Sequence, residues 1–310
     1  MGKVIRIGTR ESQLAVWQAD TVKELLRKNG YEAELVYIKS EGDTDLKTPL
    51  YEIGVQGIFT KALDIALLNN EIDIAVHSMK DVPTMMAKGI VQAAVLPRAS
   101  YKDIFVPKND EAVKTVIERD ADLPVTIATS SIRRKAQWLN RYPNDNIDNL
   151  RGNVNTRLRK VEENEWKGAI FAAAGLERIA LRPKNAIDLD WMLPAPAQGA
   201  IIVVCGADDT YAQEACAHFH DEPTSICARI ERDFLRALLG GCATPISALA
   251  RIENGKIIFE GNILSTDGRQ KKEIVKRVPV EEFGTLGAEV AKELLQNGGQ
   301  EILDGIRNGK

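Results

Sequence analysis

Residues 124–137 read Pro-Val-Thr-Ile-Ala-Thr-Ser-Ser-Ile-Arg-Arg-Lys-Ala-Gln, "PVTIATSSIRRKAQ". The apolar run at 124–128 predicts a short strand, and the three hydroxyl residues after it predict a polar loop. From Ile132 onward the stretch predicts a helix. Strand, loop and helix in this order are typical of an α/β layer built on a mainly parallel sheet.

The same order recurs on both sides of this stretch. Further strands are predicted over residues 4–8, 34–38, 72–76, 169–172 and 201–204, and further helices over about 14–26 and 60–69. The proline-rich run at 193–199 predicts a hinge, because proline interrupts both helix and sheet. The sequence therefore predicts two similar α/β units joined by a hinge.

The pattern changes beyond about residue 221. A helix over 225–239 is followed by strands over 246–252 and 256–264, and the Asn254-Gly255 pair between those strands is a strong hairpin signal. Asp267-Gly268 marks a second turn, and a closing helix is predicted over 285–296. We expect a small α+β third domain. The predicted domains are residues 1–97 with 198–220, residues 98–197, and residues 221–310.

Composition limits the classes of protein that the chain can belong to. The 310 residues are 44% hydrophobic and 27% charged, with a formal net charge of −3. This balance argues against wholesale binding of nucleic acid, and the basic segment lacks the interleaved aromatic residues of a base-stacking surface. No apolar run reaches membrane-spanning length, and the first residues lack a signal peptide. We expect a cytoplasmic protein with no membrane partner, and a monomer, because no long apolar helix seam is present.

The four cysteines, Cys205, Cys216, Cys227 and Cys242, all lie in the last third of the chain, with no C-x-x-C pair. This pattern favours free thiols over disulfides or a structural zinc site. Cys216, His218 and His220 alternate and could share one face of an extended segment. Zinc ligands usually come from separate elements, however, so we expect no metal site.

Polar residues follow the predicted strands. Because ligands bind beyond the carboxyl ends of strands in open α/β sheets, these residues are candidates for a binding site. They are Arg10 and Ser12 after the first strand, Ser78, Lys80 and Asp81 after a later one, and Thr129, Ser130, Ser131, Arg133 and Arg134 in the second unit.

Positive charge is concentrated in the second unit. From Arg133 to Lys160 the chain carries eight Lys or Arg and two Asp or Glu. Guanidinium groups match planar carboxylates and phosphates, so the segment predicts a site for a polyanionic ligand. A solvated, basic helix face with serine capping remains an equal alternative.

Two residues could carry chemistry. Asp81 is a lone carboxylate among cations and could stabilise a developing cation on a substrate, or it could cap the turn before Pro83. Cys242 follows Gly240-Gly241, whose backbone freedom could let the thiol project into a cleft. A buried, structural Cys242 is the alternative, and no Cys-His-Asn grouping lies near it.

Seven stretches in register resemble the porphobilinogen deaminase family over almost the whole chain. They read "IRIGTRESQLAVWQA", "DIAVHSMKDVPT", "ATSSIRRKAQ", "LRGNVNTRLRK", "AAAGLERI", "PAQGAI" and "GGCATPI". The resemblance implies two α/β domains similar to type II periplasmic binding proteins, which enclose a cleft, and a small α+β third domain. It also implies an enzyme that condenses four porphobilinogen molecules head to tail, with loss of ammonia, to give hydroxymethylbilane.

The resemblance further implies a role for each candidate residue. Cys242 would hold a dipyrromethane cofactor through a thioether bond, and Asp81 would be the catalytic carboxylate. Ser78, Lys80, Thr129, Ser130, Ser131, Arg133 and Arg134 would bind the cofactor carboxylates. Arg10, Ser12, Phe59, Arg151, Arg157, Arg178 and Gln198 would bind the incoming substrate.

The chain departs from the family's usual pattern at a few positions. Gln56 stands where many members carry lysine, and Ala128 replaces a usual glycine. None of the departures removes Asp81, Cys242 or the named arginines. A two-lobed solute-binding or sensing module is the rival interpretation; it explains the hinge and the arginines but leaves Asp81 and the third domain without a role.

Overall fold

The computed structural model describes residues 2–40, 60–117, 123–238 and 244–308. Contacts divide the chain into two compact units. Unit 1 comprises Met1–Leu46, Val55–Ser100 and Gln198–Ile226, and unit 2 comprises Lys47–Gly54, Tyr101–Ala197 and Cys227–Lys310. Most of the predicted second and third domains therefore fall in unit 2, and the three-domain division stays a prediction.

Unit 1 is built on a five-stranded sheet of order β2-β1-β3-β10-β4. Its strands are β1 (Ile5–Thr9), β2 (Ala33–Tyr37), β3 (Ile74–Ser78), β4 (Ile90–Val95) and β10 (Ile201–Gly206). β2, β1 and β3 are parallel, whereas β10 runs antiparallel to both β3 and β4. The sheet thus takes its antiparallel strand from a segment more than a hundred residues later in the chain.

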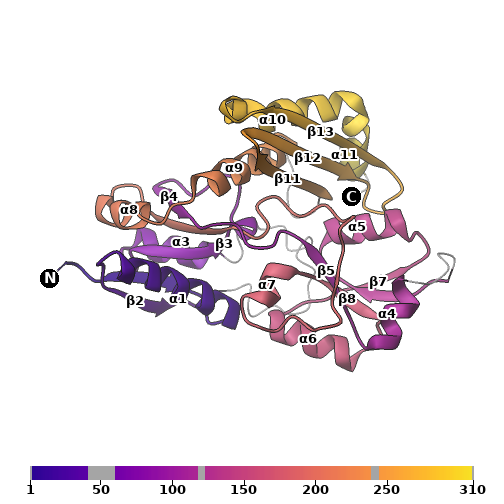
Figure 1. Ribbon diagram of the computed structural model, residues 1–310, viewed down its shortest axis with the longest axis horizontal. Helices are drawn as coiled ribbons and strands as arrows, with labels where there is room; N and C mark the ends of the chain where they lie inside the picture. Colours follow the sequence, from indigo (N-terminus) through magenta and orange to yellow (C-terminus); the bar gives the residue numbers. More distant parts are fainter. Residues whose placement is uncertain (1, 41–59, 118–122, 239–243, 309–310) are drawn as a thin grey trace. The chain divides into compact units, whose positions relative to one another are not determined.

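Helices cover both faces of this sheet. The apolar residues of α1 (Gln13–Lys28) and α8 (Thr210–Ala217) join Ile5, Ile7 and Val203 in one core. In Figure 1, α8 lies among the earlier elements of unit 1 although it follows β10 in the chain. The other face carries α3 (Lys61–Leu68), which packs so closely that a Cβ on Gly8 would lie 2.8 Å from Leu63. Glycine is required at that strand position because of this close approach.

The α/β part of unit 2 repeats the arrangement, with strand order β7-β6-β8-β5-β9. The strands are β5 (Asp103–Pro107), β6 (Thr126–Ala128), β7 (Asn146–Asp148), β8 (Gly168–Ala172) and β9 (Ile187–Asp188). β7, β6 and β8 are parallel, and β5 is antiparallel to β8 and β9. The helices are α4 (Asp110–Ile117), α5 (Ile132–Arg141), α6 (Val154–Glu163) and α7 (Ala173–Glu177).

Alternation along the strands separates two cores in this part of unit 2. Ile104 and Phe171 point to the face that also holds Val161 of α6. Phe105 and Ile170, their neighbours in sequence, point to the opposite face with Trp138 of α5. Strands buried on both faces read as nearly continuous apolar runs, which is why the sequence predicted β8. Strand β5 was not predicted.

The remainder of unit 2 is a three-stranded antiparallel sheet of order β11-β12-β13. Its elements are β11 (Ile246–Glu253), β12 (Lys256–Leu264), β13 (Lys271–Pro279), α10 (Phe283–Leu294) and α11 (Gln300–Asn308). Figure 1 shows α10 and α11 beside this sheet. Helix α9 (Glu222–Ala237) packs on it as well, with the ring centroids of Phe234 and Phe259 5.1 Å apart. The predicted fold class of two α/β sheets and a small α+β part is confirmed.

Some predicted elements were misplaced or missed. The strand predicted over 72–76 is β3 at Ile74–Ser78, so His77 and Ser78 belong to the strand and not to the loop after it. The hairpin at Asn254-Gly255 is confirmed, with φ of 51° and 72°, as a tight turn with both central residues at positive φ requires. No helix in the described residues is long and apolar enough to cross a membrane.

Candidate functional site

The first group of candidate residues lies at one edge of the unit 1 sheet. Parallel strands β1 and β3 both end there, which places Arg10 and Ser12 near Ser78, Lys80 and Asp81. The start of antiparallel β10 lies at the same edge, because Ile201 pairs with Ser78. The Lys80 ammonium accordingly lies 3.4 Å from the Gln198 side-chain oxygen.

Two serines at this edge are held by helix α1. Ser12 is the N-cap of α1, and its hydroxyl accepts a hydrogen bond from the Ala15 N–H at 3.4 Å. The Ser78 hydroxyl accepts from the Gln18 side chain of the same helix at 2.8 Å. Helix α1 therefore fixes both hydroxyls relative to the strand ends.

Asp81 is an exposed carboxylate at this edge. It closes the short 3₁₀ helix Met79–Asp81, directly after β3. Within the described ranges its side chain makes no hydrogen bond or ion pair, and the turn that follows it closes through the Val82 N–H and the Met79 carbonyl. The alternative that Asp81 serves as a turn cap is therefore not supported.

His77, on the opposite face of β3 from Ser78, was not singled out from the sequence. Its side chain is 6% exposed, and its Nε2 atom has no hydrogen-bond partner in the described parts of the chain. Burial, assisted by the positive charge of Arg10, lowers the pKa of His77 to about 4, so the imidazole is neutral near pH 7.

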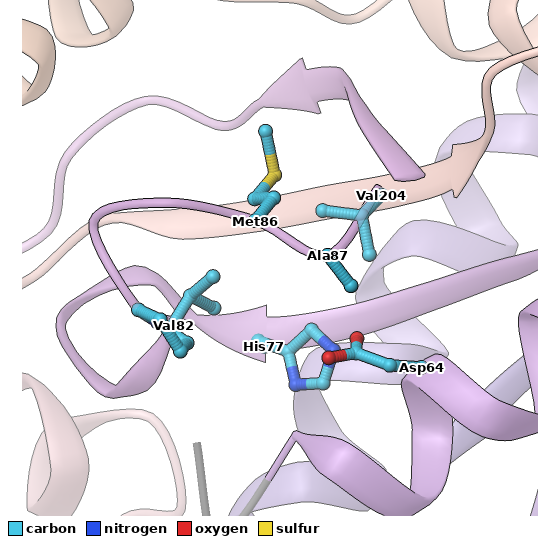
Figure 2. A pocket seen from close by; sticks show the side chains of 7 residues that line it. Asp64, His77, Val82, Met86, Ala87 and Val204 are labelled. Carbon is cyan, nitrogen blue, oxygen red and sulfur yellow. The ribbon is translucent and has the colours of Figure 1, made fainter. Parts of the chain in front are cut away.

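His77 lines a small pocket together with Asp64, Val82, Pro83, Met86, Ala87 and Val204. Figure 2 shows the imidazole and the Asp64 carboxylate facing this pocket, below the loop that carries Val82 and Met86. Burial raises the pKa of the Asp64 carboxyl. The pocket has room for about one water molecule, so it does not hold a polycarboxylate.

The second group of candidates lies at the corresponding edge of the α/β sheet in unit 2. Parallel strands β7, β6 and β8 end there, and they are followed by Arg151, by Thr129 to Arg134, and by Arg178. Thr129 to Arg134 thus follow a parallel strand, as expected from the sequence, whereas the positions of Arg151 and Arg178 after β7 and β8 come from the structure. Phe59 and Cys242 lie outside the described residues.

The three hydroxyl residues after β6 bond mainly to the backbone. The Thr129 hydroxyl accepts from the Ser131 N–H at 3.2 Å, and the Ser130 hydroxyl donates to the Leu150 carbonyl. Ser131 is the N-cap of α5 and accepts from the Arg134 N–H at 3.5 Å. These bonds shape the turn that leads into α5.

Arg133 and Arg134 are buried, with side chains 6% and 7% exposed. Both pair with Asp103, whose side chain is fully buried at the start of β5. The Arg133 Nη1 atom lies 2.7 Å from one carboxylate oxygen, and the Arg134 Nη2 atom lies 2.8 Å from the other. A solvated basic face is therefore ruled out for these two arginines.

Backbone carbonyls complete the arrangement. Arg133 Nη1 donates to the Leu193 carbonyl at 2.8 Å, and Arg134 Nη1 donates to the Ile170 carbonyl at 2.9 Å. The Nε and Nη2 groups of Arg133 have no partner in the described segments. Arg133 can therefore offer two parallel N–H donors to a ligand carboxylate.

The other arginines are held in different ways. Arg151 is 2% exposed, and its carbonyl accepts from Lys160 at 3.2 Å. Arg157 donates from Nε to the Gly152 carbonyl at 2.7 Å. Burial lowers the pKa of Arg178 to about 10, which leaves it protonated near neutral pH. The described residues contain no cluster of three His, Cys, Asp or Glu side chains that could hold a metal.

Two family models match the chain. "Porphobilinogen deaminase, dipyromethane cofactor binding domain" matches residues 5–214, and "Porphobilinogen deaminase, C-terminal domain" matches residues 225–296. A porphobilinogen deaminase of Pelobacter propionicus is 40% identical over 308 residues, which cover 97% of each chain. One of Chlorobium phaeobacteroides is 39% identical over 316 residues, which cover 99% of each chain.

Solved structures similar to the chain are more distant. The methionine-binding protein MetQ is 12% identical, with a TM-score of 0.43, over 72% of this chain and 92% of that one. A probable amino-acid transporter binding protein, ytmK of Bacillus subtilis, is 11% identical, with a TM-score of 0.40, over 70% and 90% of the two chains.

Proposed function

The chain belongs to the porphobilinogen deaminase family, and from that premise we propose that it joins four porphobilinogen molecules head to tail to give hydroxymethylbilane. Each addition releases ammonia. The chain carries the family's dipyrromethane cofactor-binding domain. Its own primer would be a dipyrromethane linked to Cys242 through a thioether bond.

The observation that carries the proposal is the contrast between the two sheet edges. The unit 1 edge presents Asp81, an exposed carboxylate with no hydrogen-bond or ion-pair partner in the described residues, directly after Lys80 in the chain. The unit 2 edge presents guanidinium groups, among them Arg133 with two N–H donors available. A substrate that becomes a cation and carries carboxylates needs one group of each kind.

Each edge has a distinct chemical task in this proposal. Loss of ammonia from porphobilinogen leaves a cation, and the Asp81 carboxylate stabilises that charge as it develops. Arg133, Arg134 and the three hydroxyl residues before them bind acetate and propionate groups. Arg10, Ser12, Phe59, Arg151, Arg157, Arg178 and Gln198 bind and orient the incoming ring, and Ser78 and Lys80 help to hold the cofactor.

The donor set fits a dipyrromethane with several carboxylates. Guanidinium groups in fixed orientation bind carboxylates bidentately, and Arg133 retains the donors to do so. When bound, the cofactor supplies the pyrrole end to which the first substrate is joined. The chain's residues bind its carboxylates, fix its orientation and stabilise the charge that forms on the substrate.

The proposal also covers the cell compartment and the partners. We propose a cytoplasmic monomer that binds no nucleic acid. Cys205 and Cys216 are buried free thiols, which is expected in a reducing compartment. Arg133, Arg134 and Arg151 belong to the basic segment, yet they are buried and not spread over a solvated face. The monomeric state rests on the sequence alone.

Replacement of Asp81 tests the proposed chemistry. Asp81→Asn removes the charge but keeps the shape, and we expect hydroxymethylbilane formation to fall by roughly 10²–10³-fold. The melting temperature should stay within error of wild type, because the carboxylate is exposed and makes no hydrogen bond or ion pair with described residues. Asp20→Asn, at an exposed aspartate of α1, is the matched control and should keep full activity.

Two results would contradict the proposal. Full turnover by Asp81→Asn would show that this carboxylate is not part of the chemistry. Tight binding of porphobilinogen by the wild-type chain without any turnover would favour the solute-binding interpretation.

A further inference from the structure

Asp103 holds two neighbouring arginines in one orientation. Consecutive residues of an α-helix point about 100° apart, so adjacent arginines do not naturally direct their guanidinium groups to one place. Arg133 and Arg134 nevertheless converge, because each contacts a different oxygen of the Asp103 carboxylate. The pairing with Arg134 is double, with Nε at 3.0 Å and Nη2 at 2.8 Å from the same oxygen.

The position of Asp103 explains why it can do this. It is the first residue of antiparallel β5 and pairs with Ala172, the last residue of β8. The carboxylate therefore lies at the sheet edge where the candidate ligand residues gather. Its side chain is fully buried, so water does not compete for the guanidinium groups. The hydrogen bond from Arg134 Nε and the ion pair with Arg133 are both stronger there than in solvent.

One nitrogen of the Arg133 guanidinium is held by the protein, and the other two are available to a ligand. Nη1 is fixed by Asp103 and by the Leu193 carbonyl, whereas Nε and Nη2 have no described partner. Fixing one nitrogen of a planar guanidinium limits the directions in which the other two can point. A ligand carboxylate then meets donors that are already oriented, so less entropy is lost on binding.

We propose that Asp103 is a positioning residue for cofactor binding, acting through Arg133 and Arg134 without contacting the cofactor. The inference rests on the proposed function, since it takes the ligand of these arginines to be the dipyrromethane carboxylates. It adds a residue from β5 to a site otherwise formed by residues after β6, β7 and β8.

The test measures how fast apo-protein acquires the cofactor when porphobilinogen is added, followed by intact mass. Asp103→Asn should slow loading by roughly tenfold to a hundredfold, the equivalent of losing one charge-assisted hydrogen bond. The matched control is Asp145→Asn. Asp145 is also a buried aspartate of unit 2, and its carboxylate accepts from the Trp138 indole N–H of α5 at 2.8 Å and from the Val125 N–H at 3.0 Å. Asp145→Asn should load the cofactor within about twofold of the wild-type rate when the variants are compared at temperatures equally far below their melting temperatures.

A second variant keeps the test decisive if Asp103→Asn folds poorly. Removing one member of a buried ion pair leaves excess charge, which destabilises strongly. Asp103→Asn combined with Arg134→Gln restores the wild-type charge balance of the cluster, so melting temperature should recover while loading stays slow. An Arg133→Gln variant should load slowly, and adding Asp103→Asn to it should cause little further loss.

The outcomes separate this inference from the proposed function. A wild-type chain that never acquires an adduct would overturn the proposed function itself. A wild-type chain that loads normally, with Asp103→Asn loading at the same rate, would overturn the positioning role alone. Equal slowing by Asp103→Asn and Asp145→Asn at matched stability would also overturn it, because the effect would then be a general loss of folding.

Discussion

Asp81 and Asp103 are both aspartates at a sheet edge, but their surroundings give them different uses. Asp81 is exposed and makes no hydrogen bond or ion pair with the described residues, so its charge is available to a ligand. Asp103 is buried and engages two guanidinium groups, so its charge is used within the protein. The sequence indicated Asp81 because it follows a predicted strand among cations. It could not indicate the pairing of Asp103, because the partners lie about 30 residues away on another element.

His77 provides a pH test at the scale of a single residue. Burial and the charge of Arg10 lower the pKa of His77 to about 4, below the value of about 6.5 for an exposed histidine. Between these values the unfolded chain binds a proton that the folded chain does not, so stability falls as pH drops from about 6.5 towards 4. The loss from this group is of the order of 3 kcal/mol.

Nuclear magnetic resonance of the histidine rings checks the His77 prediction. The resonance that disappears in His77→Asn should titrate with a midpoint near 4 in the wild-type protein. Urea unfolding at several pH values should show a smaller loss of stability below pH 6.5 in that variant. A midpoint near 6.5 would mean that the imidazole is solvated, contrary to the structure.

At the scale of elements, the sequence predicted where strands lie in the chain better than it predicted their order and direction within the sheets. Apolar runs predicted most strands of the two five-stranded sheets. The Asn254-Gly255 turn predicted the hairpin of β11 and β12. The antiparallel placement of β10 and β5 could not be predicted, because strand direction depends on where the chain crosses between units. The two-residue strand β9 and the three-residue strand β7 are too short to produce a periodic signal.

Glu231 joins three elements of unit 2. This fully buried side chain of α9 accepts from the Ala197 N–H at 2.6 Å and from the Ala250 N–H of β11 at 2.7 Å. Ala197 has a positive φ of 60°, which is costly for a residue with a Cβ, so this bond helps to hold an unfavourable backbone. The carboxylate thus links the proline-rich segment, α9 and the third sheet.

Glu231→Gln should lower the free energy of unfolding of unit 2 by about 2–4 kcal/mol. The glutamine NH₂ group would replace one carboxylate oxygen and would face a buried backbone N–H, so neither donor would have an acceptor. Urea unfolding followed by tryptophan fluorescence measures this, since Trp138, Trp166 and Trp191 all lie in unit 2. Glu289→Gln, at an exposed site on α10, is the control. Equal midpoints for the two variants would show that the Glu231 contacts contribute little.

At the scale of the whole molecule, the sequence predicted repetition and the structure explains it. Both five-stranded sheets have three parallel strands, then an antiparallel strand, then a fifth. In each sheet the antiparallel strand follows a crossing between the units: β5 comes after Ser100, and β10 comes after the chain returns to unit 1 beyond Ala197. Each edge therefore combines residues that follow parallel strands with residues at the start of an antiparallel strand, such as Asp103 at the start of β5 and Gln198 just before β10.

The proposed function depends most strongly on Cys242. The sequence around Cys242 allows either a buried structural cysteine or an exposed attachment point, and the family resemblance favours attachment. If Cys242 carries the primer, the dipyrromethane carboxylates are the ligand of the buried arginines of unit 2. If it does not, those arginines lose the ligand proposed for them.

Intact-mass measurement of the purified protein tests this claim most directly. The wild-type chain should carry an added mass equal to two pyrrole units derived from porphobilinogen, and Cys242→Ser should be unmodified and inactive. An unmodified mass in wild-type protein that forms hydroxymethylbilane would contradict the account.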